Sequence, residues 1–243
     1  MTRDAAAFIY ARADSRRLPG KIFLEIGGCK VIDIVHARAA RLDVGQVVVL
    51  TTDRGVDDPL AEYCARRGYS CFRGHPTDLV RRTLQAIDTY APLIVVRVNG
   101  DCPLFEPTLV NAALRHIRVE NRGPGDPDMV SNIITRSFPY GVSVECVRAA
   151  VYAHHAAEAV SEEREHVTQH LYRHSDRLSL HSMRDTGGNH AQRRLTLDTP
   201  ADAQMLARLC ASHDMMTIPY WEMLGITAPV PVISPCNGRS FHR

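Results

Sequence analysis

In the first hundred residues, short and largely apolar runs alternate with stretches in which apolar residues recur at helical spacing, and this alternation constrains the fold more than any other feature. The apolar runs are residues 5–10, 46–50, 69–72 and 93–98, and the helical stretches between them are 31–42, 59–67 and 77–90. Strands that are apolar on both faces belong to a sheet that is covered on both faces, and strands joined by helices are parallel. The pattern therefore predicts an α/β fold with a mostly parallel sheet between helices.

The second half of the chain is less regular. Helices are predicted at 106–117, 148–160, 163–174 and 199–212, strands at 129–134, 142–147 and 194–197, and a surface loop at 120–128. From Thr227 onward the chain holds three prolines, Pro229, Pro231 and Pro235, and ends in Gly238-Arg239-Ser240, which is typical of an extended or partly disordered arm. The expectation is one domain over residues 1–226 followed by a tail over 227–243.

Composition narrows the class of protein and of partner. The 243 residues are 45% hydrophobic, which suits one large α/β domain with a full core. A formal net charge of +2 gives no general attraction to nucleic acid or to a membrane surface, so neither is an expected partner. The seven cysteines are scattered without a CxxC pair, which predicts reduced thiols rather than a zinc ribbon or a disulfide framework. No signal peptide and no apolar run of bilayer length is visible, so we expect a cytoplasmic protein.

In parallel α/β sheets, ligands bind beyond the carboxyl ends of the strands. That rule places four segments, 12–21, 51–53, 73–74 and 99–101, on one edge of the predicted sheet. The search for chemistry therefore concentrates on these four loops.

The first loop gathers four cations around Ser15 and Gly20, namely Arg12, Arg16, Arg17 and Lys21. A triphosphate carries roughly four negative charges, and forked guanidinium groups, an ammonium and backbone N–H groups are its natural ligands. Neither a Walker A motif nor GxGxxG is present. From charge and position alone, a solvated basic turn explains the loop as well as a triphosphate site does.

Two aspartates, Asp101 and Asp198, follow other predicted strands. Carboxylates at strand ends can hold Mg²⁺ together with substrate phosphates. Each also has an ordinary structural explanation, Asp101 as a turn residue and Asp198 as a cap for the helix that begins near Pro200. His166, His170 and His174 are spaced as on one helix face, but Val167 stands where a zinc protease motif has Glu, so a polar helix face is favoured over zinc.

Four segments resemble, in the same order, signature elements of the cytidylyltransferase family. ARADSRRLPGK at 11–21 resembles its ARxxSxRLPGK signature, NGDCPL at 99–104 its GDCPL element, REHVT at 164–168 its REHVT element, and LDTPAD at 197–202 its xDTPxD element. The family includes the acylneuraminate and 3-deoxy-manno-octulosonate cytidylyltransferases, and the resemblance is greatest to the SpsF-like proteins of spore coat polysaccharide biosynthesis. It extends from about Phe8 to about Leu209.

The resemblance implies a Rossmann-like nucleotide-diphospho-sugar transferase fold, with a mixed sheet and a small dimerisation and acceptor-binding element at about 129–185. It implies a homodimer that transfers CMP from CTP to an acidic acceptor, uses Mg²⁺ and releases pyrophosphate. The residues implied for the nucleotide are Ala11, Arg12, Ser15, Arg17, Lys21, Thr52, Arg73, Gly74 and Asn99. Lys21, Arg17 and Asp101 are implied in catalysis, Asp101 and Asp198 as metal ligands, and Arg136, Tyr140, Ser143, Glu145 and His166 on the acceptor side.

The sequence departs from the family mainly on the acceptor side. Tyr140 and Ser143 both stand where the relatives usually have Asp, with Arg as a further family choice at Tyr140, so the acceptor is open between a sugar acid and a phosphate or phosphonate. His166 and Glu145 are candidates for a base, if the acceptor needs one. Other options are a different nucleoside triphosphate with a sugar phosphate, or a nucleotide-binding partner protein without catalytic activity.

Overall fold

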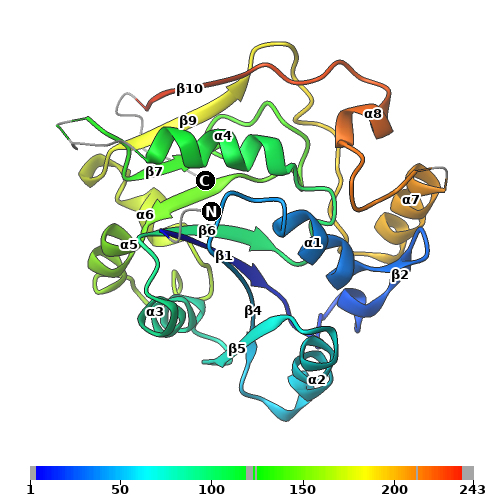
Figure 1. The fold of residues 1–243 in the computed structure, drawn as a ribbon. Helices are drawn as coiled ribbons and strands as arrows, with labels where there is room; N and C mark the ends of the chain where they lie inside the picture. The colour runs from blue at the N-terminus through cyan, green and yellow to red at the C-terminus, as the bar shows by residue number, and fades with distance from the viewer. Residues whose placement is uncertain (1–3, 119–122, 124, 212, 237–243) are drawn as a thin grey trace.

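The computed structural model describes residues 4–118, 123, 125–211 and 213–236, and they form a mixed α/β structure around one large sheet (Figure 1). Within these residues the sheet has the strand order β10-β9-β7-β8-β6-β1-β4-β5. The strands are β1 (Ala5–Tyr10), β4 (Gln46–Thr52), β5 (Ser70–Gly74), β6 (Ile94–Asn99), β7 (Met129–Ser131), β8 (Glu145–Arg148), β9 (Leu180–Asp185) and β10 (Pro231–Pro235). A separate hairpin pairs β2 (Glu25–Ile26) with β3 (Cys29–Lys30).

The half of the sheet formed by β1, β4, β5 and β6 is parallel throughout, as the apolar runs predict. β1 pairs in parallel with β4 and β6, and β4 pairs in parallel with β5. The other half is mixed, because β8 runs antiparallel to β6 and β7 while β9 is parallel to β7. Only β8 and β10 run in the direction opposite to the other six strands, so the sheet is mostly parallel.

Helices cover both faces of the sheet (Figure 1). They are α1 (Val31–Ala39), α2 (Asp58–Arg67), α3 (Leu79–Tyr90), α4 (Pro107–Ile117), α5 (Ala149–Ala156), α6 (Gln169–Arg173), α7 (Pro200–Cys210) and α8 (Tyr220–Leu224), with 3₁₀ turns at Lys21–Phe23, Gly55–Asp57 and Ser175–Arg177. One core cluster packs α1, α2, α4, α7 and α8 on one face, and a second packs α3, α5 and α6 on the other. Alternate β1 side chains enter the two clusters: Phe8 joins one and Ile9 the other. The apolar character of both faces of β1 follows from this arrangement.

Three predicted elements differ from the structure. The helix expected over 163–174 begins only at Gln169, because residues 161–165 form turns and 166–168 bends, and the Glu163 carboxylate accepts the backbone N–H of Val160. The strand expected at 194–197 is a single bridge between Tyr140 and Arg194. The tail, expected as an extended or partly disordered arm, is extended at Pro231–Pro235, but there it forms β10, which pairs with β9 at the edge of the sheet.

The remaining boundaries agree within a few residues, and parts of three predicted segments lie outside the described residues. These parts are residues 120–122 and 124 of the predicted loop, residue 212 at the end of a predicted helix, and residues 237–243 of the tail. All seven cysteines are free. Across the part of the chain that is described, no helix combines the length and the apolar character that crossing a bilayer would require.

Candidate active site

The carboxyl ends of β1, β4, β5 and β6 lie level with one another. The register pairs Tyr10 with both Leu50 and Asn99, and Thr52 with Gly74. The loops at 12–21, 51–53, 73–74 and 99–101 therefore meet at one edge of the sheet, as predicted. A cavity of about 590 Å³ opens at this edge.

Several of the predicted site residues line this cavity together. The first loop contributes Ala11, Arg12, Ser15, Arg17 and Lys21. Asp101 joins them from the loop after β6, Asp198 from the segment before α7, and His166 from the turns before α6. Residues far apart in the sequence thus line one cavity. Because this lining is charged and comes from several segments, the first loop is part of a cavity rather than an isolated solvated turn.

The first loop is held by backbone hydrogen bonds and by one buried carboxylate. Gly20 adopts φ 69°, a conformation that favours glycine, and its N–H donates to the carbonyl of Ala13 at 3.0 Å. The N–H of Ala13 donates in turn to the Asp57 carboxylate at 2.7 Å, and Asp57 is fully buried. Asp57 also accepts from the Thr52 hydroxyl, so it ties the loop after β1 to the end of β4. The cations of the loop are therefore carried on a fixed backbone.

Lys21 joins the two candidate metal carboxylates. Its Nζ donates to Asp101 Oδ2 at 2.7 Å and to Asp198 Oδ1 at 2.9 Å. Partial burial by itself lowers the pKa of this ammonium, but the charges and hydrogen bonds of the two carboxylates outweigh it and raise the pKa. Lys21 is therefore a permanent cation between two strand-end aspartates.

Asp198 is the most heavily paired carboxylate of the site. Besides Lys21 it receives Arg17 Nη2 at 3.1 Å and Arg194 Nη2 at 2.8 Å. Burial by itself raises the pKa of Asp198, but the hydrogen bond and charge of Lys21, together with Arg17 and Arg194, lower it. Asp202 accepts the backbone N–H groups of Asp198 and Thr199 as part of a capping box for α7, which fixes Asp198 at the helix start. The cap of α7 is Thr199, whose hydroxyl accepts the N–H of Asp202, so the Asp198 carboxylate does not cap the helix as the sequence suggested, and its metal-binding role stays a prediction.

The carboxylates of Asp101 and Asp198 fit a magnesium ion. Their oxygens reach a single ammonium, so they are close enough to share one cation, and carboxylate oxygen is the ligand that Mg²⁺ prefers. No set of three His, Cys, Asp or Glu side chains within the described residues could hold a metal ion. Two protein carboxylates are enough for Mg²⁺, because this ion usually completes its coordination shell with water and substrate phosphates.

Four residues predicted to bind nucleotide lie beside the cavity without lining it. Thr52 is buried and its hydroxyl serves Asp57. Arg73 donates to the carbonyls of Thr52 and Arg54 at 3.0 Å each, which braces the loop after β4. A Cβ on Gly74 would meet the Arg82 side chain at 2.8 Å, and Asn99 precedes the lining residues Gly100 and Asp101. Their nucleotide roles stay predictions.

The turns that carry His166 are attached to the start of α3. The carbonyl of Arg164 accepts the N–H of Leu79 at 2.7 Å, and the Arg164 guanidinium pairs with Asp78 at 2.9 Å. His166 is exposed to the cavity, whereas His170 is buried in α6 and His174 follows the helix. The three histidines therefore share no helix face, which corrects the helical arrangement that their spacing suggested.

Glu145 lies in a buried network beneath the site. Its carboxylate pairs with Arg97 at 2.5 Å and accepts the hydroxyls of Thr168 at 2.7 Å and Tyr172 at 2.8 Å. Only 1% of the residue is exposed. In this structure Glu145 does not reach the cavity, so among the two candidate bases only His166 is accessible to a ligand.

The other predicted acceptor residues lie on the far side of Asp198. Tyr140 is 43% exposed, and the guanidinium carbon of Arg136 lies 4.9 Å from its ring centroid. Ser143 is half-buried two residues beyond Gly141. The structure places Arg136 and Tyr140 together, and neither is among the residues that line the cavity.

Sequence reasoning missed several residues that line or border the cavity, namely Tyr10, Thr77, Leu79, Arg82, Glu165 and Arg194. For Thr77, Leu79 and Arg82 a signal existed, because the segment after β5 ends at the same sheet edge. Arg194 carried none, since its approach to Asp198 depends on a turn that periodicity does not show.

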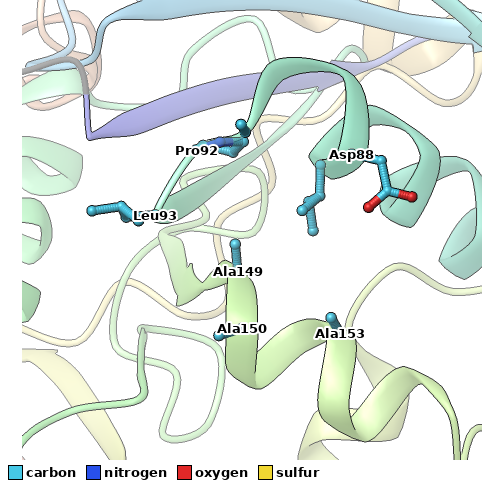
Figure 2. A pocket seen from close by; sticks show the side chains of 8 residues that line it. Asp88, Pro92, Leu93, Ala149, Ala150 and Ala153 are labelled. Atoms are coloured by element: carbon cyan, nitrogen blue, oxygen red, sulfur yellow. The ribbon is translucent and has the colours of Figure 1, made fainter.

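A second hollow, of about 450 Å³, lies between the end of α3, the start of β6 and α5 (Figure 2). Its lining is mostly apolar, with Asp88 as the charged exception and Leu93 68% exposed. It offers no set of polar groups that converge on a ligand, so the chemistry is assigned to the first cavity.

Comparison with known proteins agrees with this geometry. The family model described as cytidylyltransferase matches residues 6–224. The chain is 27% identical over 214 residues to the spore coat polysaccharide biosynthesis protein SpsF of Bacillus subtilis, covering 85% of this chain and 86% of that protein. It is 31% identical over 140 residues to the 3-deoxy-manno-octulosonate cytidylyltransferase of Chromohalobacter salexigens, covering 57% and 51%. A solved cytidylyltransferase of Leptospira borgpetersenii superposes with a TM-score of 0.84 at 27% identity, covering 92% of this chain and 93% of that one.

Proposed function

The chain belongs to the cytidylyltransferase family and is a nucleotidyltransferase, and we propose that it transfers CMP from CTP to an acidic acceptor with release of pyrophosphate. The observation that carries the proposal is the contact of Lys21 with both Asp101 and Asp198 inside the cavity. It supports the proposal because a cation suited to phosphate and two carboxylates suited to a divalent metal ion meet at one point. The similarity to a 3-deoxy-manno-octulosonate cytidylyltransferase favours a sugar acid as acceptor.

The reaction is an in-line attack of an acceptor oxygen on the α-phosphorus of CTP. In such reactions the protein mainly positions the groups and neutralises charge. Lys21 and Arg17 stabilise the negative charge that develops on the leaving pyrophosphate, while Ser15 and the backbone of the first loop donate to the phosphates. Asp101 and Asp198 would hold Mg²⁺, which would supply Lewis-acid polarisation of the α-phosphate.

His166 is the candidate for holding the proton of an acceptor hydroxyl. It lies in the loop attached to α3 and lines the same cavity as Lys21 and Asp198. A phosphate or phosphonate acceptor is already anionic and needs no base, so the effect of replacing His166 separates the two acceptor classes. His166→Gln lowers kcat for a hydroxyl acceptor and leaves an anionic oxygen acceptor unaffected.

The decisive experiment measures pyrophosphate release with CTP, GTP, UTP and dTTP against sugar acids, phosphonates and sugar phosphates, with Mg²⁺ present. We expect release with CTP and an acid only. Equal release with another nucleoside triphosphate, or release only when a sugar phosphate is paired with a nucleoside triphosphate other than CTP, contradicts the proposal. The proposal includes a homodimer in which residues 129–185 supply the acceptor side and the contact surface, and sedimentation analysis tests that part.

A further inference from the structure

Two arginines from distant parts of the chain meet at the ring of Tyr140. The guanidinium carbon of Arg136 lies 4.9 Å from the ring centroid, and that of Arg194 lies 5.0 Å from it. Both cations therefore lie against one partly exposed aromatic ring. Tyr140 is 43% exposed and the Arg194 side chain is also 43% exposed, so a ligand can approach.

The backbone fixes this arrangement. The N–H of Tyr140 donates to the carbonyl of Arg193 at 2.8 Å, and its carbonyl accepts the N–H of Leu195 at 2.7 Å. Gly141 makes the approach possible, because it adopts φ 103° and a Cβ there would lie 2.7 Å from the Leu195 carbonyl carbon. A bond from the N–H of Leu197 to the carbonyl of Asp101 then ties the same segment to the metal-binding loop. The cluster is thus positioned relative to the reacting groups.

The hydrogen bonds of the two guanidinium groups leave donors unused. Arg194 gives Nε to Asp202 at 3.1 Å and Nη2 to Asp198 at 2.8 Å, whereas its Nη1 has no partner among the described residues. Arg136 has no carboxylate or hydrogen-bond acceptor within the described part of the chain, and its recorded contact is the Tyr140 ring. Two like charges beside one ring, one of them without a counter-ion, leave local positive potential open to an anion.

We propose that Arg194 acts with Arg136 and Tyr140 as a subsite for an anionic group of the acceptor that is separate from its attacking oxygen. The carboxylates bonded to Nε and Nη2 hold the Arg194 fork in place and leave Nη1 facing the ligand. Because Arg194 also donates to Asp198, this subsite adjoins one of the two carboxylates proposed to hold Mg²⁺. The inference rests on the proposed function and deepens it, since it identifies Arg194 as a residue that determines acceptor specificity.

The test compares one acid with its uncharged form. Pyrophosphate release from CTP is measured with 3-deoxy-manno-octulosonate, N-acetylneuraminate and the methyl ester of each, for the wild type and for Arg136→Gln, Arg194→Lys and Arg193→Gln. Arg193→Gln is the matched control, because Arg193 is exposed, adjacent to Arg194, and without a side-chain partner among the described residues. We expect Arg136→Gln and Arg194→Lys to raise the KM for the acid about 10- to 100-fold.

Three further readouts distinguish ligand recognition from a structural effect. The KM for CTP stays within twofold, the KM for the ester changes little, and Arg193→Gln matches the wild type throughout. An unchanged acceptor KM in both Arg136→Gln and Arg194→Lys, or an equal loss for acid and ester, overturns this inference while the proposed function stands. Failure of the wild type to release pyrophosphate from CTP with either acid overturns the sugar-acid form of the proposed function and this inference with it.

Discussion

Replacing Lys21 by methionine removes the charge at the centre of the site while retaining most of the side-chain volume. Nζ makes two charge-assisted hydrogen bonds, at 2.7 Å and 2.9 Å, and under the proposed function it neutralises the leaving pyrophosphate. Loss of one preorganised transition-state contact of this kind costs about 3–4 kcal/mol. We therefore expect kcat for pyrophosphate release to fall by about 10²- to 10³-fold, measured with saturating CTP and acceptor.

The same substitution is expected to strengthen metal binding, although it lowers kcat. In the nucleotide-free protein Nζ lies between Asp101 and Asp198, so it competes with a divalent cation for their oxygens. Lys21→Met is expected to bind Mn²⁺ about tenfold more tightly than the wild type, since each hydrogen bond to a charged group contributes about 1.5–3 kcal/mol. Free Mn²⁺ measured by its paramagnetic signal reports this directly.

Lys30 is the matched control, because the chain has no lysine other than Lys21 and Lys30. It forms an exposed pair with Glu25 in the hairpin at 3.0 Å, away from the cavity. Lys30→Met should leave kcat and Mn²⁺ binding unchanged. Wild-type turnover in Lys21→Met, or equally weak Mn²⁺ binding in both variants, would refute the assignment of Lys21.

Three other substitutions test the structure around the site. Gly141→Ala forces a side chain into φ 103° against Leu195, and should lower the free energy of unfolding by about 2 kcal/mol or more in urea titration; an unchanged midpoint contradicts the close approach. Asp57→Ala leaves the N–H of Ala13 without its acceptor, and should raise the KM for CTP but not for the acceptor, so equal changes in both argue against a role in the first loop. Burial lowers the pKa of His170 to about 4, so the native state resists a proton that the unfolded chain accepts below pH 6.5. The contribution of neutral His170 to the free energy of unfolding is therefore present above pH 6.5, and it falls by about 2 kcal/mol as the pH drops from 7 to 5. His170→Phe should remove most of this pH dependence, and an unaltered pH profile of stability would contradict the reasoning.

The parallel half of the fold was predictable because its signals are local. β1 and β6 are apolar on both faces, and the charged loops follow their last residues directly in the sequence. The tail was harder to predict, since Pro231 and Pro235 argue against a central strand. β10 resolves this by lying at the edge of the sheet, where a missing N–H costs little.

The acceptor side was harder to predict for a different physical reason. The family resemblance implies Glu145 on the acceptor side, yet its buried position follows from pairing with Arg97 on a neighbouring strand, which no local pattern encodes. Arg194 reaches Tyr140 through a single bridge between segments more than fifty residues apart. By contrast, the residues of the first loop that line the cavity lie within one run of eleven residues, so their grouping is visible in the sequence itself.

Asp198 connects the two sides of the site through its charge balance. It is only 7% exposed, and a carboxylate at that depth is unfavourable without partners. Lys21 and Arg17 pair with it from the first loop, and Arg194 from the segment that bridges to Tyr140. Under the proposed function, a triphosphate attracts Lys21 and Arg17, and the metal ion that accompanies it replaces their charge at Asp198. The Asp198 carboxylate is then never left unpaired. Arg194 keeps its contact with Asp198 while Lys21 and Arg17 move from this carboxylate to the triphosphate.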